Sequence, residues 1–233
     1  MRALLSTHSL NAYYGDAQVL FGVDFELAQG ELVAIIGANG AGKSTFLKAL
    51  TGMVTAPNDA VQFKGRKIGG LPPSDIVRLG MALVPEGRRL FPSLTVEENL
   101  LMGSTAQRAG PWDLQRLYEL FPILKDKRRV PATSLSGGQQ QMVALGRALM
   151  SNPEVLLCDE LSLGLAPIVI REIYKAMPSI TAEGMTVVIV EQDVATAKQV
   201  SNRLYCLQEG RVSLQGNSSE ISREEISQAY FGI

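Results

Sequence analysis

The sequence predicts an α/β fold with a parallel core sheet, an additional antiparallel β part and an inserted helical subdomain. Three short apolar runs are typical of strands that are buried on both faces of a parallel sheet; they span residues 32–36, 155–158 and 186–190. Segments compatible with helices separate these runs, which indicates a sheet covered by helices. Residues 93–151 contain no convincing strand and are therefore expected to form the helical insert.

Further strands are expected around this core. Residues 19–27 alternate between apolar and other side chains, and a period of two predicts a half-buried strand of an antiparallel sheet. The apolar run Met81–Val84 is another candidate strand. Gly210 separates two short strand-like runs, which predicts a hairpin, and a helix near residues 224–230 is expected to close the chain.

Three helices are expected within the insert. Thr95 and Glu98 have the spacing of a capping box, in which each residue caps the other's backbone at the start of a helix. Pro111 is expected to open the second helix, because apolar residues follow it at helical spacing. The third helix is expected to follow Gly138 and to run to about Met150.

The chain is expected to form a single domain of 233 residues, with an α/β core over residues 1–92 and 152–233 and a helical subdomain over residues 93–151. Its net charge of −1 argues against a nucleic-acid partner. No apolar run approaches the roughly 20 residues of a membrane-spanning helix, and the first five residues lack a signal-peptide core. We therefore expect a cytosolic protein that would reach a membrane only by docking onto another protein.

A phosphate-binding loop directly follows the apolar run at residues 32–36. The segment fits the pattern G-x-x-x-x-G-K-[ST] and precedes a helix-compatible stretch, which predicts a P-loop NTPase core. Glycines let backbone N–H groups turn toward phosphate oxygens, Lys43 is expected to reach the β- and γ-phosphates, and Ser44 is expected to bind Mg²⁺. The segment consists of Gly37, Ala38, Asn39, Gly40, Ala41, Gly42, Lys43, Ser44 and Thr45.

Two carboxylates end the apolar run at residues 155–158. Ligands bind at the carboxyl ends of parallel strands, so Asp159 and Glu160 are expected to lie beside the phosphate loop. Asp159 is expected to hold Mg²⁺ directly or through water. Glu160, one residue further, is expected to orient and deprotonate the water that attacks the γ-phosphate.

A third motif, Leu-Ser-Gly-Gly-Gln, lies about 90 residues after the phosphate loop. It supplies a hydroxyl and exposed N–H groups at a predicted helix start, which can bind an anion. With this motif the sequence resembles the ABC ATPase family. The resemblance implies that four of these residues bind the γ-phosphate of an ATP held by another subunit: Ser136, Gly137, Gly138 and Gln139.

The resemblance covers the whole chain and is most similar to the shorter ATPase subunit of branched-chain amino acid importers. The stretches that carry it are residues 84–92, 94–100, 162–167 and 190–192. Importers of urea and short-chain amides have similar sequences in these stretches, so the resemblance leaves the transported substrate open.

Two positions depart from the family at large. Glu86 stands where the family has a glutamine that contacts Mg²⁺ and the attacking water, and the resemblance implies a metal-binding and catalytic role for it. Gln192 stands where most members have the histidine that touches the γ-phosphate. Its amide can donate a hydrogen bond but never carries a positive charge. Both changes leave the rate of catalysis open.

The adenine ring is assigned to Tyr14, which matches the aromatic residue that stacks on the base in the family. Tyr13 is the competing assignment, because it is adjacent and equally able to stack.

The resemblance implies an ATP-hydrolysing subunit, with ATP and Mg²⁺ as cofactors, that drives a membrane importer from the inner face of the plasma membrane. Two such subunits, identical or paralogous, would sandwich two ATP molecules. The helical insert and residues 86–98 would contact integral-membrane permease subunits, and a periplasmic substrate-binding protein would be an indirect partner.

Three other functions remain open. A soluble ABC ATPase of translation or DNA repair usually has two cassettes or a long coiled coil, whereas this chain has one cassette and no sustained heptads. A kinase or GTPase would leave the Leu-Ser-Gly-Gly-Gln motif unexplained, and no Asn-Lys-x-Asp motif for guanine is present. A regulatory subunit that binds ATP without hydrolysing it is compatible with Glu86 and Gln192.

Overall fold

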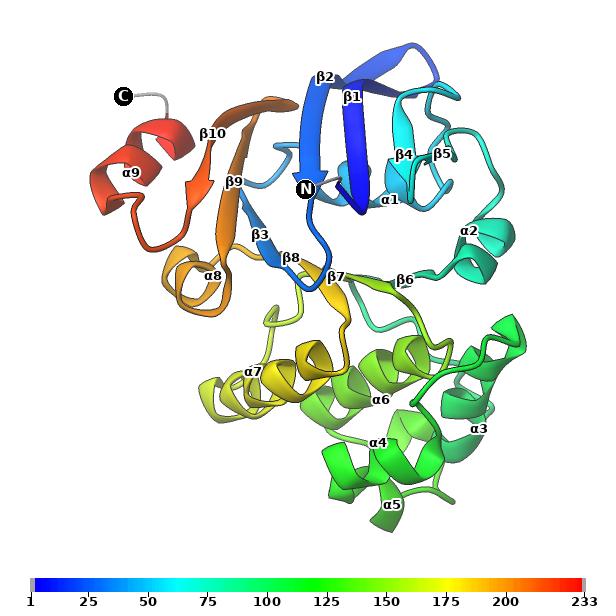
Figure 1. The fold of residues 1–233 in the computed structure, drawn as a ribbon. Helices are drawn as coiled ribbons and strands as arrows, with labels where there is room; N and C mark the ends of the chain where they lie inside the picture. The colour runs from blue at the N-terminus through cyan, green and yellow to red at the C-terminus, as the bar shows by residue number, and fades with distance from the viewer. Residues whose placement is uncertain (1–2, 232–233) are drawn as a thin grey trace.

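Two sheets and a helical layer make up the computed structural model, which describes residues 3–231 (Figure 1). The larger sheet has six strands in the order β10-β9-β3-β8-β7-β6. All neighbouring pairs in it are parallel except β9 and β10, which form the antiparallel hairpin predicted around Gly210. The strands are β3 (Leu32–Ile36), β6 (Met81–Val84), β7 (Val155–Asp159), β8 (Thr186–Val190), β9 (Arg203–Gln208) and β10 (Arg211–Asn217).

The three continuous apolar runs form the centre of this sheet. Every residue of β3, β7 and β8 is buried, because helices or the second sheet cover both faces. The prediction of a parallel core sheet is therefore confirmed. Since these strands run in the same direction, the segments that follow them meet at one edge of the sheet.

The smaller sheet is antiparallel and contains the strand predicted at residues 19–27. Its order is β2-β1-β4-β5. A shared core lies between the two sheets and around α1 (Lys43–Leu50). In it, the ring centroid of Phe25 lies 5.2 Å from that of Phe46 and 4.8 Å from that of Tyr205. The strands are β1 (Leu5–Tyr14), β2 (Ala17–Leu27), β4 (Val61–Phe63) and β5 (Arg66–Lys67), and α2 (Pro73–Leu79) leads from β5 to β6.

Only helices and turns connect β6 to β7, and they lie together beneath the larger sheet (Figure 1). The predicted capping box of Thr95 and Glu98 is present at the start of the first helix. The prediction that Pro111 opens the second helix is wrong, because the side chain of Asp113 accepts a hydrogen bond from Arg116 N and caps the helix there instead. The helices are α3 (Val96–Leu101), α4 (Leu114–Leu120), α5 (Pro122–Asp126) and α6 (Gly137–Leu149), with short 3₁₀ turns at Met102–Ala106 and Ala132–Ser134.

Three more helices complete the fold: α7 (Pro167–Ala182), α8 (Val194–Val200) and α9 (Arg223–Phe231). The last of them agrees with the helix predicted near residues 224–230. No helix among residues 3–231 is long and apolar enough to cross a membrane. Of the five amino-terminal residues expected to lack a signal core, Met1 and Arg2 lie outside the described residues.

Candidate nucleotide-binding site

The phosphate loop connects β3 to α1 and closes around the side chain of Lys43. Gly37 must be a glycine, because a Cβ atom there would lie 2.2 Å from the carbonyl oxygen of Leu207. The ammonium group of Lys43 donates hydrogen bonds to the carbonyl oxygens of Gly37 at 2.8 Å and of Ala38 at 3.0 Å. Burial lowers the pKa of Lys43, although the carboxylates of Glu160 and Asp159 oppose this effect. The loop thus holds one buried cation at the start of a helix, where an anion is favoured.

Ser44 and Asp159 come together although they are far apart in the sequence. The hydroxyl of Ser44 donates to Asp159 Oδ1 at 3.0 Å. Burial raises the pKa of Asp159 to about 6, and the nearby negative charge of Glu160 acts in the same direction. A hydroxyl and a carboxylate side by side are oxygen ligands suited to Mg²⁺.

The oxygen ligands fit Mg²⁺ only together with a bound phosphate. Among residues 3–231, no group of three or more histidine, cysteine or acidic side chains could hold a metal ion by itself. Mg²⁺ in nucleotide sites commonly uses one or two protein ligands plus phosphate oxygens and water. Ser44 and Asp159 satisfy that requirement, and Glu86 lines a pocket that Ser44 also lines.

Glu160 and Gln192 follow β7 and β8, so the parallel sheet brings them to the same edge. The amide nitrogen of Gln192 donates to both carboxylate oxygens of Glu160, at 3.0 and 2.9 Å. Lys43 Nζ lies 3.9 Å from Glu160 Oε1. Glu160 itself has a left-handed backbone conformation, with φ of 51°, which is strained for a side chain with a Cβ atom and is compatible with a functional position.

Lys43, Glu160 and Gln192 line one open pocket of about 620 Å³, whereas Asp159 does not line it. Val19 of β2 and Leu163, after β7, also line it, and no sequence motif assigns either residue to the site. Tyr14 does not line this pocket, and both Tyr13 and Tyr14 are about half exposed at the end of β1. The lining residues singled out in the sequence are Asn39, Gly40, Gly42, Lys43, Ser44, Thr45, Glu86, Glu160 and Gln192.

The Leu-Ser-Gly-Gly-Gln motif starts α6, and none of its residues lines this pocket. Ser136 is the N-cap of the helix, and it forms a capping box with Gln139. Gly138 packs against α7 so closely that a Cβ atom would lie 2.2 Å from Val169 Cγ1. The motif therefore lies apart from the phosphate-loop pocket of its own chain.

Arg147 of α6 contacts the segment that follows Glu86, and no sequence motif predicts this role. Arg147 donates to the carbonyl oxygens of Arg88 at 3.1 Å and Arg89 at 2.8 Å, and its guanidinium lies 5.4 Å from the ring centroid of Phe91. Arg88 and Arg89 both have positive φ angles, so their backbone needs such support. No local pattern around Arg147 indicates this contact.

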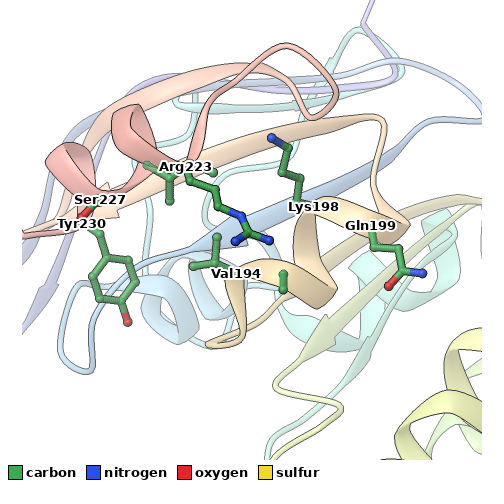
Figure 2. Close-up of a pocket in the computed structure, with 8 residues that line it drawn as sticks. Val194, Lys198, Gln199, Arg223, Ser227 and Tyr230 are labelled. Atoms are coloured by element: carbon green, nitrogen blue, oxygen red, sulfur yellow. The ribbon is translucent and has the colours of Figure 1, made fainter.

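A second open pocket, of about 600 Å³, lies between α8 and α9 (Figure 2). It contains Lys198 and Arg223 among largely apolar neighbours, and Lys198 Nζ donates a hydrogen bond to the carbonyl oxygen of Ile221. None of the residues predicted to bind nucleotide or metal lines it, so the phosphate-loop pocket is the candidate site.

This combination of a phosphate loop, an acidic strand end and a helix-starting Ser-Gly-Gly defines an ATP-binding cassette. Residues 20–162 match the ABC transporter family, and the chain belongs to that family. The predicted fold and enzyme class, an ABC-type ATP hydrolase, are thereby confirmed.

Two curated relatives have specific transport names. The chain is 44% identical to the high-affinity branched-chain amino acid transport ATP-binding protein BraG of Pseudomonas aeruginosa, over 98% of this chain and 100% of that protein. It is 35% identical to the probable branched-chain amino acid transport ATP-binding protein LivF of Archaeoglobus fulgidus, over 95% of each. The solved structure of a nucleotide-free ATP-binding cassette of an ABC transporter aligns with a TM-score of 0.84 at 27% identity, covering 98% of this chain and 95% of that one.

Proposed function

We propose that this chain is the ATP-hydrolysing subunit of an importer for branched-chain amino acids. The observation that carries the proposal is the position of Glu160, whose carboxylate lies 3.9 Å from Lys43 Nζ and one residue beyond the Ser44–Asp159 pair. The substrate class is supported by 44% identity, over nearly the whole chain, to a protein named for that transport.

Each residue has a distinct proposed task in hydrolysis. Lys43 and the N–H groups of the phosphate loop bind the β- and γ-phosphates. Ser44, Asp159 and Glu86 are proposed to hold Mg²⁺, which would neutralise developing charge on the phosphates. Glu160 accepts the proton of the attacking water, and Gln192 orients that carboxylate and donates a hydrogen bond toward the γ-phosphate.

The separation of the Leu-Ser-Gly-Gly-Gln motif from the phosphate loop supports the proposed partners. Ser136, Gly137, Gly138 and Gln139 lie outside the pocket of their own phosphate loop, which supports ATP binding between two subunits. The second subunit is a copy or a paralogue. The helical subdomain, residues 93–151, is proposed to contact permeases at the inner face of the plasma membrane, as are residues 86–98. A periplasmic binding protein is proposed as an indirect partner, and no nucleic acid is proposed to bind.

The substitution Glu160→Gln tests the hydrolytic role. Glutamine keeps the shape and one acceptor oxygen but cannot take a proton at neutral pH. The variant should bind ATP as the wild type does and lose about 10²–10⁴-fold in rate. Unchanged hydrolysis would show that Glu160 is not the base.

The same variant tests the assembly. Because blocked hydrolysis should trap ATP between subunits, size-exclusion chromatography with Mg-ATP should show a dimer of Glu160→Gln. Adding Ser136→Arg should abolish that dimer, since the long side chain would fill the second anion site. Chromatography of the variant mixed with a paralogous ATPase distinguishes the two assemblies, because the second protein co-elutes with the variant only in a heterodimer. A dimer that persists with Ser136→Arg would contradict the sandwich arrangement.

A further inference from the structure

A buried carboxylate, Glu191, links the two loops that carry the proposed catalytic pair. It follows β8 directly, and its side chain is fully buried, with 0% of its surface exposed. The carboxylate accepts hydrogen bonds from Ser162 N at 3.2 Å, from the hydroxyl of Ser162 and from the hydroxyl of Tyr174 on α7. A buried carboxylate is costly unless it is hydrogen-bonded in this way.

Glu191 and its partner Ser162 each lie within two residues of a member of the proposed catalytic pair, Glu160 and Gln192. Gln192 is the next residue, and Ser162 lies two residues after Glu160. The same two loops also meet through Glu160 N, which donates to Val190 O at 3.0 Å, and through the amide of Gln192 on the Glu160 carboxylate. Glu191 thus forms one of three connections between these loops, and the Glu160–Gln192 contact forms another.

The loop after β7 needs an anchor of this kind. Glu160 has a left-handed backbone conformation, and such a conformation persists only where the surroundings enforce it. Leu161 packs into the core, with 1% of its surface exposed, while both hydrogen-bond donors of Ser162 bind Glu191. The Tyr174 hydroxyl donates to Oε1, which also accepts from Ser162 N, while the Ser162 hydroxyl donates to Oε2, so both carboxylate oxygens are held.

We propose that Glu191 is a positioning residue for ATP hydrolysis. Through Ser162 and Tyr174, it fixes the position of the Glu160 loop relative to Gln192. The inference rests on the proposed function, because it assigns Glu191 a role in placing the base Glu160. Glu191 does not line the phosphate-loop pocket, so it acts through its neighbours and not on the nucleotide. Its effect should therefore appear in kcat and not in ATP binding.

The test compares variants of the full chain in steady-state ATP hydrolysis and in calorimetric binding of Mg-ATP. Glu191→Ala should lower kcat by about 10²-fold, the scale expected when a reacting group is displaced by about 1 Å. KM and Kd for ATP should change less than about twofold by the same argument. Glu191→Gln keeps one acceptor oxygen and should restore part of kcat. Tyr174→Phe removes only one donor and should lower kcat by less than Glu191→Ala does.

A matched control lies at the other end of the same strand. Thr186 is also fully buried, and its hydroxyl accepts a hydrogen bond from Gly30 N at 2.9 Å, away from the site. Thr186→Val should lower the melting temperature and leave kcat unchanged. If Glu191→Ala does not fold, Tyr174→Phe compared with Thr186→Val decides the question.

Two results would overturn the inference: a wild-type kcat in folded Glu191→Ala or in Tyr174→Phe, or parallel losses in kcat and ATP affinity. Glu160→Gln, measured alongside, separates this from failure of the proposed function. If Glu160→Gln is inactive while the Glu191 and Tyr174 variants match the wild type, only the positioning role is wrong. If Glu160→Gln hydrolyses ATP normally, the base assignment itself is wrong.

Discussion

The side-chain amide of Gln192 donates to both carboxylate oxygens of Glu160, at 3.0 and 2.9 Å. The two residues are 32 positions apart and follow neighbouring parallel strands. One nitrogen that donates to both oxygens restrains the rotation of the carboxylate, and a neutral amide does so without adding a positive charge. Gln192 can therefore orient the proposed base even though it cannot neutralise charge on the γ-phosphate.

Replacement of Gln192 by alanine should slow hydrolysis by about 10²-fold, which is the cost of removing one preorganised donor. ADP affinity should stay unchanged, because the contact concerns the base and the γ-phosphate. Turnover assays and ADP titration calorimetry would measure both. An equal loss of ADP affinity would place Gln192 elsewhere in the nucleotide site.

Lys43→Ala should abolish tight ATP binding. The ammonium group is the buried cation of the phosphate loop, and truncating one partner of a buried charge pair costs about 2–5 kcal/mol. Calorimetry with ATP provides the measurement, and circular dichroism checks that the variant is folded. Wild-type affinity in a folded Lys43→Ala protein would exclude Lys43 from the site.

Tyr14→Ala should weaken ATP and GTP binding alike, by about 1–3 kcal/mol, because stacking does not read the edge of the base. Tyr13→Ala is a natural control, since the two rings are adjacent and similarly exposed. Nucleotide titrations of both variants would decide the assignment. A larger effect from Tyr13→Ala would move the stacking role by one residue.

Asp159 should make stability depend on pH in the Mg²⁺-free protein. Burial raises its pKa to about 6 in the folded chain, from the ordinary value of 3.8 expected in the unfolded chain. Between these two pH values, the folded chain therefore binds more protons than the unfolded chain does. The free energy of unfolding should therefore fall as the pH rises from about 4 to above 6. Urea unfolding of wild type and Asp159→Asn would test this, because the variant lacks that contribution. An identical pH dependence in both proteins would contradict the raised pKa.

Short, contiguous patterns determined most of the fold and the core of the site. The apolar runs at residues 32–36, 155–158 and 186–190 encode strands because burial on both faces requires continuous hydrophobicity. The phosphate loop and the capping box at Thr95 are likewise local, since their hydrogen bonds and backbone angles involve residues a few positions apart. Such features can be predicted without knowing what packs against them.

Tertiary structure alone decided the contacts between distant segments. Arg147 supports a backbone almost 60 residues away, and Glu191 meets Ser162 and Tyr174 across three separate elements. In each case local chemistry permitted several partners, and strand order and helix packing selected one of them by bringing only that partner within hydrogen-bonding distance.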